Sequence, residues 1–177
     1  MKRFFFAAAA ALLASIPSAS ATPKPSIFTG LDENHMAIVE QSFAHGVPVV
    51  LDTETCLNEG MAGYYNGRVI AICMTGNGWD EENKDTLRHE AHHMVQDCLV
   101  DGKPDFQFPG NRTMFTNPVD FAIHGANFTE RQVQQIYVTY AGFGLDEADI
   151  LIEVEAWAVA ASVDAAAIAY ALDDFCK

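Results

Sequence analysis

Apolar residues follow two different spacings along the chain, one typical of helices and one typical of strands. They recur every three or four positions in four segments, which are predicted to be helices: residues 32–44, 84–98, 129–140 and 146–173. Two short apolar runs, residues 47–51 and 68–74, are predicted strands, and residues 52–58 and 63–67 are predicted turns. Strands placed before a long helix favour an α+β fold. A small helical bundle is the alternative, because helices dominate.

Capping residues mark the ends of two predicted helices. Thr129 and Gln132 form a capping-box pattern at the start of one of them. Asp85 or Thr86 is the expected cap of the helix that follows the second strand. Residues 101–125, rich in Pro, Gly and Asn, are predicted to be a long loop, and loops of that length are usually functional or folded back on themselves.

The segment His89-Glu90-Ala91-His92-His93 contains the pattern H-E-x-x-H. His89 and His93 are four positions apart, so on a helix they share one face and can bind one metal ion together. Imidazole nitrogen suits zinc, and catalytic zinc sites leave one coordination position open. Glu90 is the candidate general base of such a site. A pair of His89 and His92 also fits by spacing, but the position of Glu90 favours His93. We expect His92 to support a ligand or to face solvent.

A third ligand is expected from a later helix. Glu153 and Glu155 lie in an otherwise apolar helical segment, and buried carboxylates of this kind need a partner, which a metal ion supplies. Side chains two positions apart on a helix point about 200° away from each other, so helical spacing alone does not choose between the two.

Together, R-H-E-x-x-H and the later E-x-E-A-x-A resemble the gluzincin metallopeptidases, whose third ligand is a glutamate on a later helix. In the related pattern E-x-x-A-x-A the first glutamate is the ligand, which corresponds to Glu153 and leaves Glu155 as the fallback. No G-x-x-H follows His93, as it would in metzincins, and the N-E-x-x-S-D motif of thermolysin is absent. The resemblance implies a minimal zincin-like domain, with a small, mostly antiparallel sheet packed on the metal-binding helix and further helices after it.

The resemblance also implies a zinc-dependent peptidase with one Zn²⁺ per chain, held by His89, His93 and Glu153. Zinc would lower the pKa of its water, and Glu90 would act first as base and then as acid. Zincins hold an extended peptide along the edge strand before the metal helix, so residues 68–74 are the candidate platform, an ordinary core strand being the alternative.

An oxyanion-stabilising donor is also expected, without a single favourite. The candidates are Tyr137, Tyr140, His124 and Arg112. His35 and His45 are predicted to be solvated helix residues.

The first 21 residues have the anatomy of a secretory signal peptide. Lys2 and Arg3 precede an apolar run too short to span a bilayer, and Ala19-Ser20-Ala21 is a small-residue cleavage site. Residues 22–177 would then form a single zincin-like metallopeptidase domain. Without the two basic residues, eight basic side chains face 24 acidic ones, a net charge of about −16. Such a charge repels nucleic acid and anionic membranes.

All four cysteines lie after this segment, which in an exported chain favours two disulfides. Of the three pairings, we favour Cys56–Cys73, across a hairpin-like segment, with Cys98–Cys176, from the metal helix to the C-terminal end. A thiolate zinc site is disfavoured because the chain has no C-x-x-C pair.

The sequence thus predicts a secreted or periplasmic zinc metallopeptidase that acts on peptides or proteins. It has no stable membrane anchor after signal cleavage, and its oligomeric state is not specified. Two alternatives stay open. One is a non-catalytic exported protein stabilised by a metal, and the other is an amidase that acts on a cell-wall amide. A structural metal site would be closed by a fourth protein ligand, and Glu90 would then have no clear role.

Overall fold

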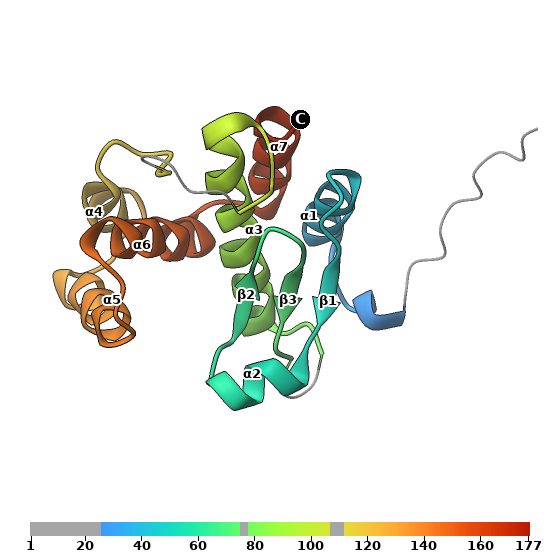
Figure 1. Cartoon of the computed structure of the whole chain (residues 1–177), viewed down its shortest axis with the longest axis horizontal. Coiled ribbons are helices and arrows are strands. Elements are labelled where there is room, and N and C mark those ends of the chain that lie inside the picture. Colours follow the sequence, from blue (N-terminus) through green and yellow to red (C-terminus); the bar gives the residue numbers. More distant parts are fainter. Residues whose placement is uncertain (1–25, 75–77, 107–111) are drawn as a thin grey trace, which may run out of the picture.

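Figure 1 shows the computed structural model of the chain, which describes residues 26–74, 78–106 and 112–177. The predicted signal segment, residues 1–21, lies outside them. The α-helices are α1 (Glu33–Ala44), α2 (Thr53–Glu59), α3 (Glu81–Asp101), α4 (Pro118–Asp120), α5 (Glu130–Gly142), α6 (Glu147–Ser162) and α7 (Ala165–Phe175). The strands are β1 (Val49–Leu51), β2 (Gly63–Tyr65) and β3 (Ile70–Ile72), and two short turns are the 3-10 helix η1 (Ser26–Phe28) and the π-helix η2 (Phe121–Gly125). The predicted α+β class is confirmed.

The sheet differs from its prediction in two ways. Its order in the described residues is β1-β3-β2, with β1 parallel and β2 antiparallel to β3, so the sheet is mixed rather than mostly antiparallel. The predicted platform, residues 68–74, contains the central strand β3, whose three residues are fully buried. The edge-strand assignment is therefore wrong. The edge strand beside α3 is β2, in a segment that was predicted to be a turn.

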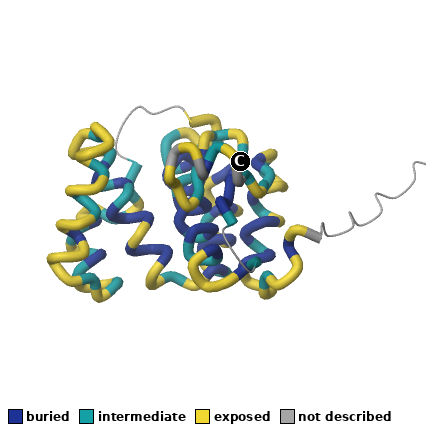
Figure 2. Tube along the Cα trace, turned by 90° about the horizontal axis from the view of Figure 1, so that it is seen from below, coloured by how far each residue is buried: buried dark blue, intermediate teal, exposed yellow. Residues whose placement is uncertain are grey.

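Helix α3 lies at the centre of the fold. Figure 1 shows the sheet and α1 on one side of it and α4, α5 and α6 on the other. The larger apolar core joins α3 to the sheet, α1 and α7, and a smaller one joins α5, α6 and η2. Figure 2 shows the buried positions on the inner turns of the trace and the exposed ones along its outer turns. Because α3 and α6 contact each other, the predicted ligand helices are neighbours.

Capping residues explain where several elements differ from prediction. The segment predicted as a turn at residues 52–58 contains α2, because the Asp52 carboxylate accepts hydrogen bonds from the N–H groups of Glu54 and Thr55. Helix α3 begins at Glu81 and is capped by Asp80 rather than by Asp85 or Thr86. The long helix predicted at 146–173 is two helices.

The break between α6 and α7 falls at Val163 and Asp164. Val163 has extended backbone angles, and the Asp164 side chain accepts a hydrogen bond from the N–H of Ala166, which starts α7. Two other helices agree with prediction. Asp32 caps α1, and the capping box of Thr129 and Gln132 is confirmed at the start of α5.

Both predicted disulfides are confirmed. Cys56–Cys73 joins α2 to the residue after β3, with Cα atoms 5.5 Å apart, and Cys98–Cys176 joins α3 to the residue after α7, with Cα atoms 5.0 Å apart. Each is expected to stabilise the fold by about 2–4 kcal/mol, chiefly by restricting the unfolded chain. None of the helices formed by the described residues combines the length and the apolar composition that crossing a membrane requires.

Candidate metal centre

The two histidines of H-E-x-x-H converge on one face of α3. The Nε2 atoms of His89 and His93 are 3.0 Å apart, and their rings meet edge to face, with centroids 4.6 Å apart. His89 is buried and His93 is partly buried. The helical spacing thus places both imidazoles as the sequence predicted.

Helix α6 supplies the third group. The Oε2 atom of Glu153 lies 3.3 Å from His89 Nε2 and 3.4 Å from His93 Nε2. Ligands at about 2.0 Å from a tetrahedral ion are about 3.3 Å from one another. The three observed separations therefore match the edges of a tetrahedral coordination sphere, and these three residues form a group that could hold a metal ion.

Glu153 Oε2 lacks a hydrogen-bond partner for its negative charge among the described residues. It is buried, although two imidazole nitrogens face it. A buried carboxylate oxygen without a partner is costly, and a cation between the three atoms would satisfy it. Two neutral nitrogens and one carboxylate also form a donor set found in catalytic zinc sites. The residues present therefore fit a divalent metal.

Gln96 fixes the orientation of His93. His93 Nδ1 donates to Gln96 Oε1 at 2.8 Å, which leaves Nε2 directed at the other two groups. The Gln96 amide in turn donates to Ile152 O at 3.1 Å and to Glu155 Oε1 at 3.0 Å. A ligating histidine that is held through its second nitrogen binds metal more tightly, because its ring is already oriented.

Glu155, the fallback ligand, is committed to other partners. It is fully buried, and His92 Nε2 donates to its Oε1 at 2.9 Å. The N–H groups of Met114 and Phe115 donate to the two oxygens at 2.9 and 2.8 Å. The carboxylate is thus satisfied without a metal, and the group that could hold one contains Glu153. His92 does not face solvent: it is buried and supports Glu155.

Burial and neighbouring charges shift the pKa values of the two histidines in opposite directions. Burial lowers the pKa of His89 to about 4, and the neighbouring His93 acts in the same direction. Burial also acts against the charge of His93, but Glu153 outweighs it and raises the pKa of His93 to about 9. Burial acts against the charged form of Glu153. The charge of His93 and the contacts with both histidines outweigh burial and hold the pKa of Glu153 well below its usual range. The carboxylate that raises the pKa of His93 thus has its own pKa lowered by His93.

Glu90 lies between the metal group and the edge strand. It is 6% exposed, and burial, together with the charge of Glu153, raises its pKa to about 7. Its Cγ atom would lie 3.1 Å from a Cβ placed on Gly63 of β2. The backbone of Tyr65, on the same strand, acts weakly in the opposite direction on the pKa of Glu90. The candidate base is therefore positioned by β2 as well as by α3.

Gly63 allows this close approach, which gives a prediction. A Cβ at Gly63 would lie 2.7 Å from Thr86 Cγ2 and 2.8 Å from Ala71 O, and the second contact is with backbone that cannot rotate away. We expect Gly63→Ala to lower the free energy of unfolding by about 1–3 kcal/mol, measured by urea denaturation. Gly142→Ala is the matched control, because nothing lies within 4 Å of its Cβ position. An equal, small effect of both substitutions would contradict the close packing of β2 on α3.

Of the four oxyanion candidates, the structure brings Tyr140 to the site. Its hydroxyl accepts a hydrogen bond from Trp157 Nε1 at 3.0 Å. Burial and the charge of Glu153 raise the pKa of Tyr140 well above its usual range, so the hydroxyl keeps its proton and can donate a hydrogen bond. The other three lie elsewhere: Arg112 pairs with Asp149 at 3.0 Å, Tyr137 interacts with Glu147, and His124 is exposed.

Trp157 and Gln96 belong to the site but were not singled out from the sequence. The Trp157 ring packs on His89, with centroids 4.6 Å apart, and is 36% exposed. Both residues stand at helical spacing from a ligand, Trp157 four positions after Glu153 and Gln96 three after His93. That spacing was the available signal.

Two histidines outside the site differ from their prediction as solvated residues. His35 is buried, and its Nδ1 atom lies 2.8 Å from the Asp32 carboxylate. His45 is partly buried, and its Nε2 atom is covered and without a hydrogen-bond partner among the described residues. The amphipathic pattern missed both, because the packing of α1 against its neighbours is not local.

The chain matches no family model, no curated protein and no solved structure. The resemblance to gluzincins therefore depends on the two sequence motifs, and the metal group depends on the geometry described above.

Proposed function

We propose that the protein is an exported zinc metallopeptidase with a zincin-like fold. The observation that carries the proposal is the convergence of His89, His93 and Glu153, with Glu90 beside them on α3. The two disulfides are compatible with an oxidising compartment outside the cytosol, in line with the predicted signal segment.

The residues of the chain divide the chemistry among them. A bound zinc ion would supply Lewis acidity and an activated water. Glu90 takes the proton of the attacking water onto its carboxylate and returns it to the leaving nitrogen, as general base and then general acid. The hydroxyl of Tyr140 donates a hydrogen bond towards the oxygen that becomes negative in the transition state. The proposed substrate is a peptide or protein, because the motif resemblance points to peptidases.

The first test measures metal and activity in the same preparation. We expect about one zinc per chain by elemental analysis, hydrolysis of casein, and loss of that hydrolysis with a chelator. Readdition of zinc should restore it, because the three ligands are already close together. A metal-free preparation with full activity would refute the proposed site.

Parallel incubation with peptidoglycan distinguishes the remaining alternatives. Release of peptides from peptidoglycan, with casein left intact, would identify the cell-wall amidase. Zinc binding without hydrolysis of either substrate would identify the metal-stabilised binding protein. Among the described residues the metal group has three protein ligands, which favours an open catalytic site over a closed structural one.

A further inference from the structure

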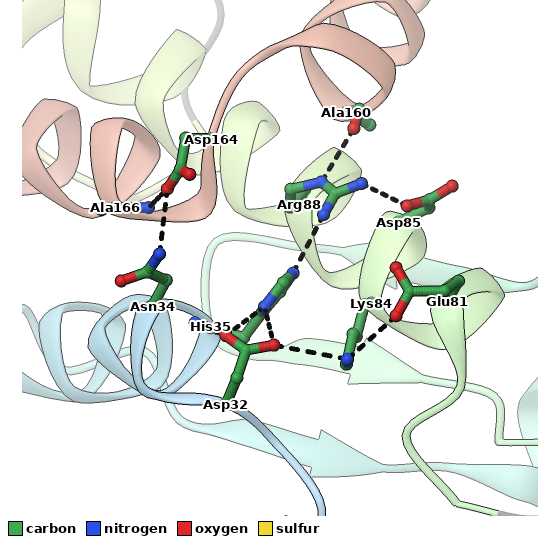
Figure 3. Close-up of polar contacts among 10 residues, drawn as sticks. All are labelled: Asp32, Asn34, His35, Glu81, Lys84, Asp85, Arg88, Ala160, Asp164 and Ala166. Atoms are coloured by element: carbon green, nitrogen blue, oxygen red, sulfur yellow. Dashed lines mark hydrogen bonds and ion pairs between the residues drawn. The ribbon is translucent and has the colours of Figure 1, made fainter.

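A cluster of polar side chains lies where α1, α3 and α6 meet, next to the metal group but outside it (Figure 3). Its centre is Arg88, the residue before His89. All three guanidinium nitrogens have partners: Nε donates to Ala160 O at 2.8 Å, Nη1 donates to His35 Nε2 at 3.0 Å, and Nη2 donates to Asp85. The three acceptors come from α6, α1 and α3 itself.

The contact with α6 meets a need of that helix. Ala160 lies in its last turn, where carbonyl groups have no N–H partner within the helix. A cation there also interacts favourably with the negative end of the helix. Arg88 therefore caps the C-terminal end of α6 from α3.

The contact with α1 holds Arg88 in place. Because a guanidinium can only donate, His35 Nε2 is the acceptor, and the His35 proton is on Nδ1. Nδ1 lies 2.8 Å from both oxygens of Asp32 and donates to that carboxylate, which Lys84 also approaches at 3.3 Å. The side chain of Arg88 is thus fixed by a chain of contacts that begins at the cap of α1.

Two hydrogen-bonding contacts between α3 and α6 lie on either side of the metal ligands. Along α3 the order is Arg88, then the two histidine ligands, then Gln96; along α6 it is Ile152, then Glu153, then Ala160. Gln96 joins Ile152 O, and Arg88 joins Ala160 O, so α3 and α6 are tied on both sides of the ligands. Ala160 is seven positions from Glu153, roughly 10 Å along the helix, so the contact of Arg88 with α6 lies away from the ligand atoms. Arg88 itself cannot be a ligand, because a guanidinium only donates.

We propose that Arg88 is a positioning residue that sets metal affinity, by holding the Glu153 helix at binding distance from the histidine helix before the metal arrives. This inference rests on the proposed metal site and extends it to a residue that touches no ligand atom. Outer residues that orient ligands commonly change metal affinity 10–100-fold when they are replaced.

The test compares zinc affinity in the disulfide-bonded chain, by competition with a chromogenic chelator. Arg88→Met is expected to weaken zinc binding at least 10-fold, with the stoichiometry unchanged. Arg131→Met is the matched control. It makes the same substitution at an exposed position of α5, outside both the metal group and the Arg88 cluster. We expect its zinc affinity to stay within about twofold of the wild type.

Arg88→Lys separates charge from geometry. A single ammonium cannot reach three acceptors on three helices, so its zinc affinity is expected between those of the wild type and Arg88→Met. If Arg88→Met does not fold, Arg88→Lys decides: wild-type affinity in it overturns the inference. Equal affinity in wild type and Arg88→Met, or an equal loss in Arg131→Met, overturns it as well. A wild type that binds no zinc overturns the proposed site together with the inference.

Discussion

Replacing Glu90 with glutamine is expected to reduce peptide hydrolysis by about 10²–10⁴-fold while the chain keeps its zinc. Glutamine has nearly the same shape as glutamate, so the packing of this side chain against Gly63 of β2 should persist. It has no carboxylate to take up a proton, so the chemical step is slowed. The measurement is kcat on a peptide substrate, beside zinc content in the same sample.

Zinc content, melting temperature and KM of the same variant serve as controls, because they report folding and binding rather than chemistry. A Glu90→Gln protein with one zinc per chain, an unchanged melting temperature and a KM near that of the wild type isolates the loss to catalysis. If the variant hydrolyses peptides at the full rate, Glu90 is not the base. If it loses zinc instead, the glutamate supports the ligands rather than the reaction.

The second large effect concerns the two glutamates of α6. Glu153→Gln is expected to weaken zinc binding by more than 100-fold, beyond the effect of an outer residue, because it removes a ligand charge. Glu155→Gln is expected to keep one zinc per chain but to lower the free energy of unfolding by about 1–3 kcal/mol, because its fully buried carboxylate accepts four hydrogen bonds.

The two variants serve as controls for each other. Both replace a glutamate of the same helix, two positions apart, with the same amide. Glu153→Gln should show the larger loss of zinc affinity, measured by chelator competition. Glu155→Gln should show the larger loss of stability, measured by urea denaturation. The reverse result, zinc lost with Glu155 and kept with Glu153, would reassign the third ligand.

Local chemistry predicted much of this structure. The capping box at Thr129 depends on a short-range pattern, the histidine pair on motif spacing, and the disulfide pairing on the number and positions of the cysteines. The structure contains all three features. Residue Glu153 followed from the resemblance of a short motif, whereas helical spacing left Glu155 equally open. The distances to the histidines now separate the two.

What the sequence did not predict is mostly non-local. The central position of β3 depends on its pairing with two other strands, which the pattern of one strand cannot reveal. The burial of His35 depends on Arg88, 53 positions later. The break at Val163 is different, because Asp164 is a good helix cap in an apolar run, and that signal could have been used.

The disulfide between Cys98 and Cys176 has a practical consequence for any zinc measurement. Cys98 lies five positions after His93, so the bond anchors the far end of the metal helix. In a reduced sample that helix would lose its anchor, and four thiolates, which are strong zinc ligands, would be released. Such a sample would take up extra zinc at sulfur while its histidine site became weaker. Stoichiometry is therefore informative only for protein whose thiols have first been shown to be fully oxidised.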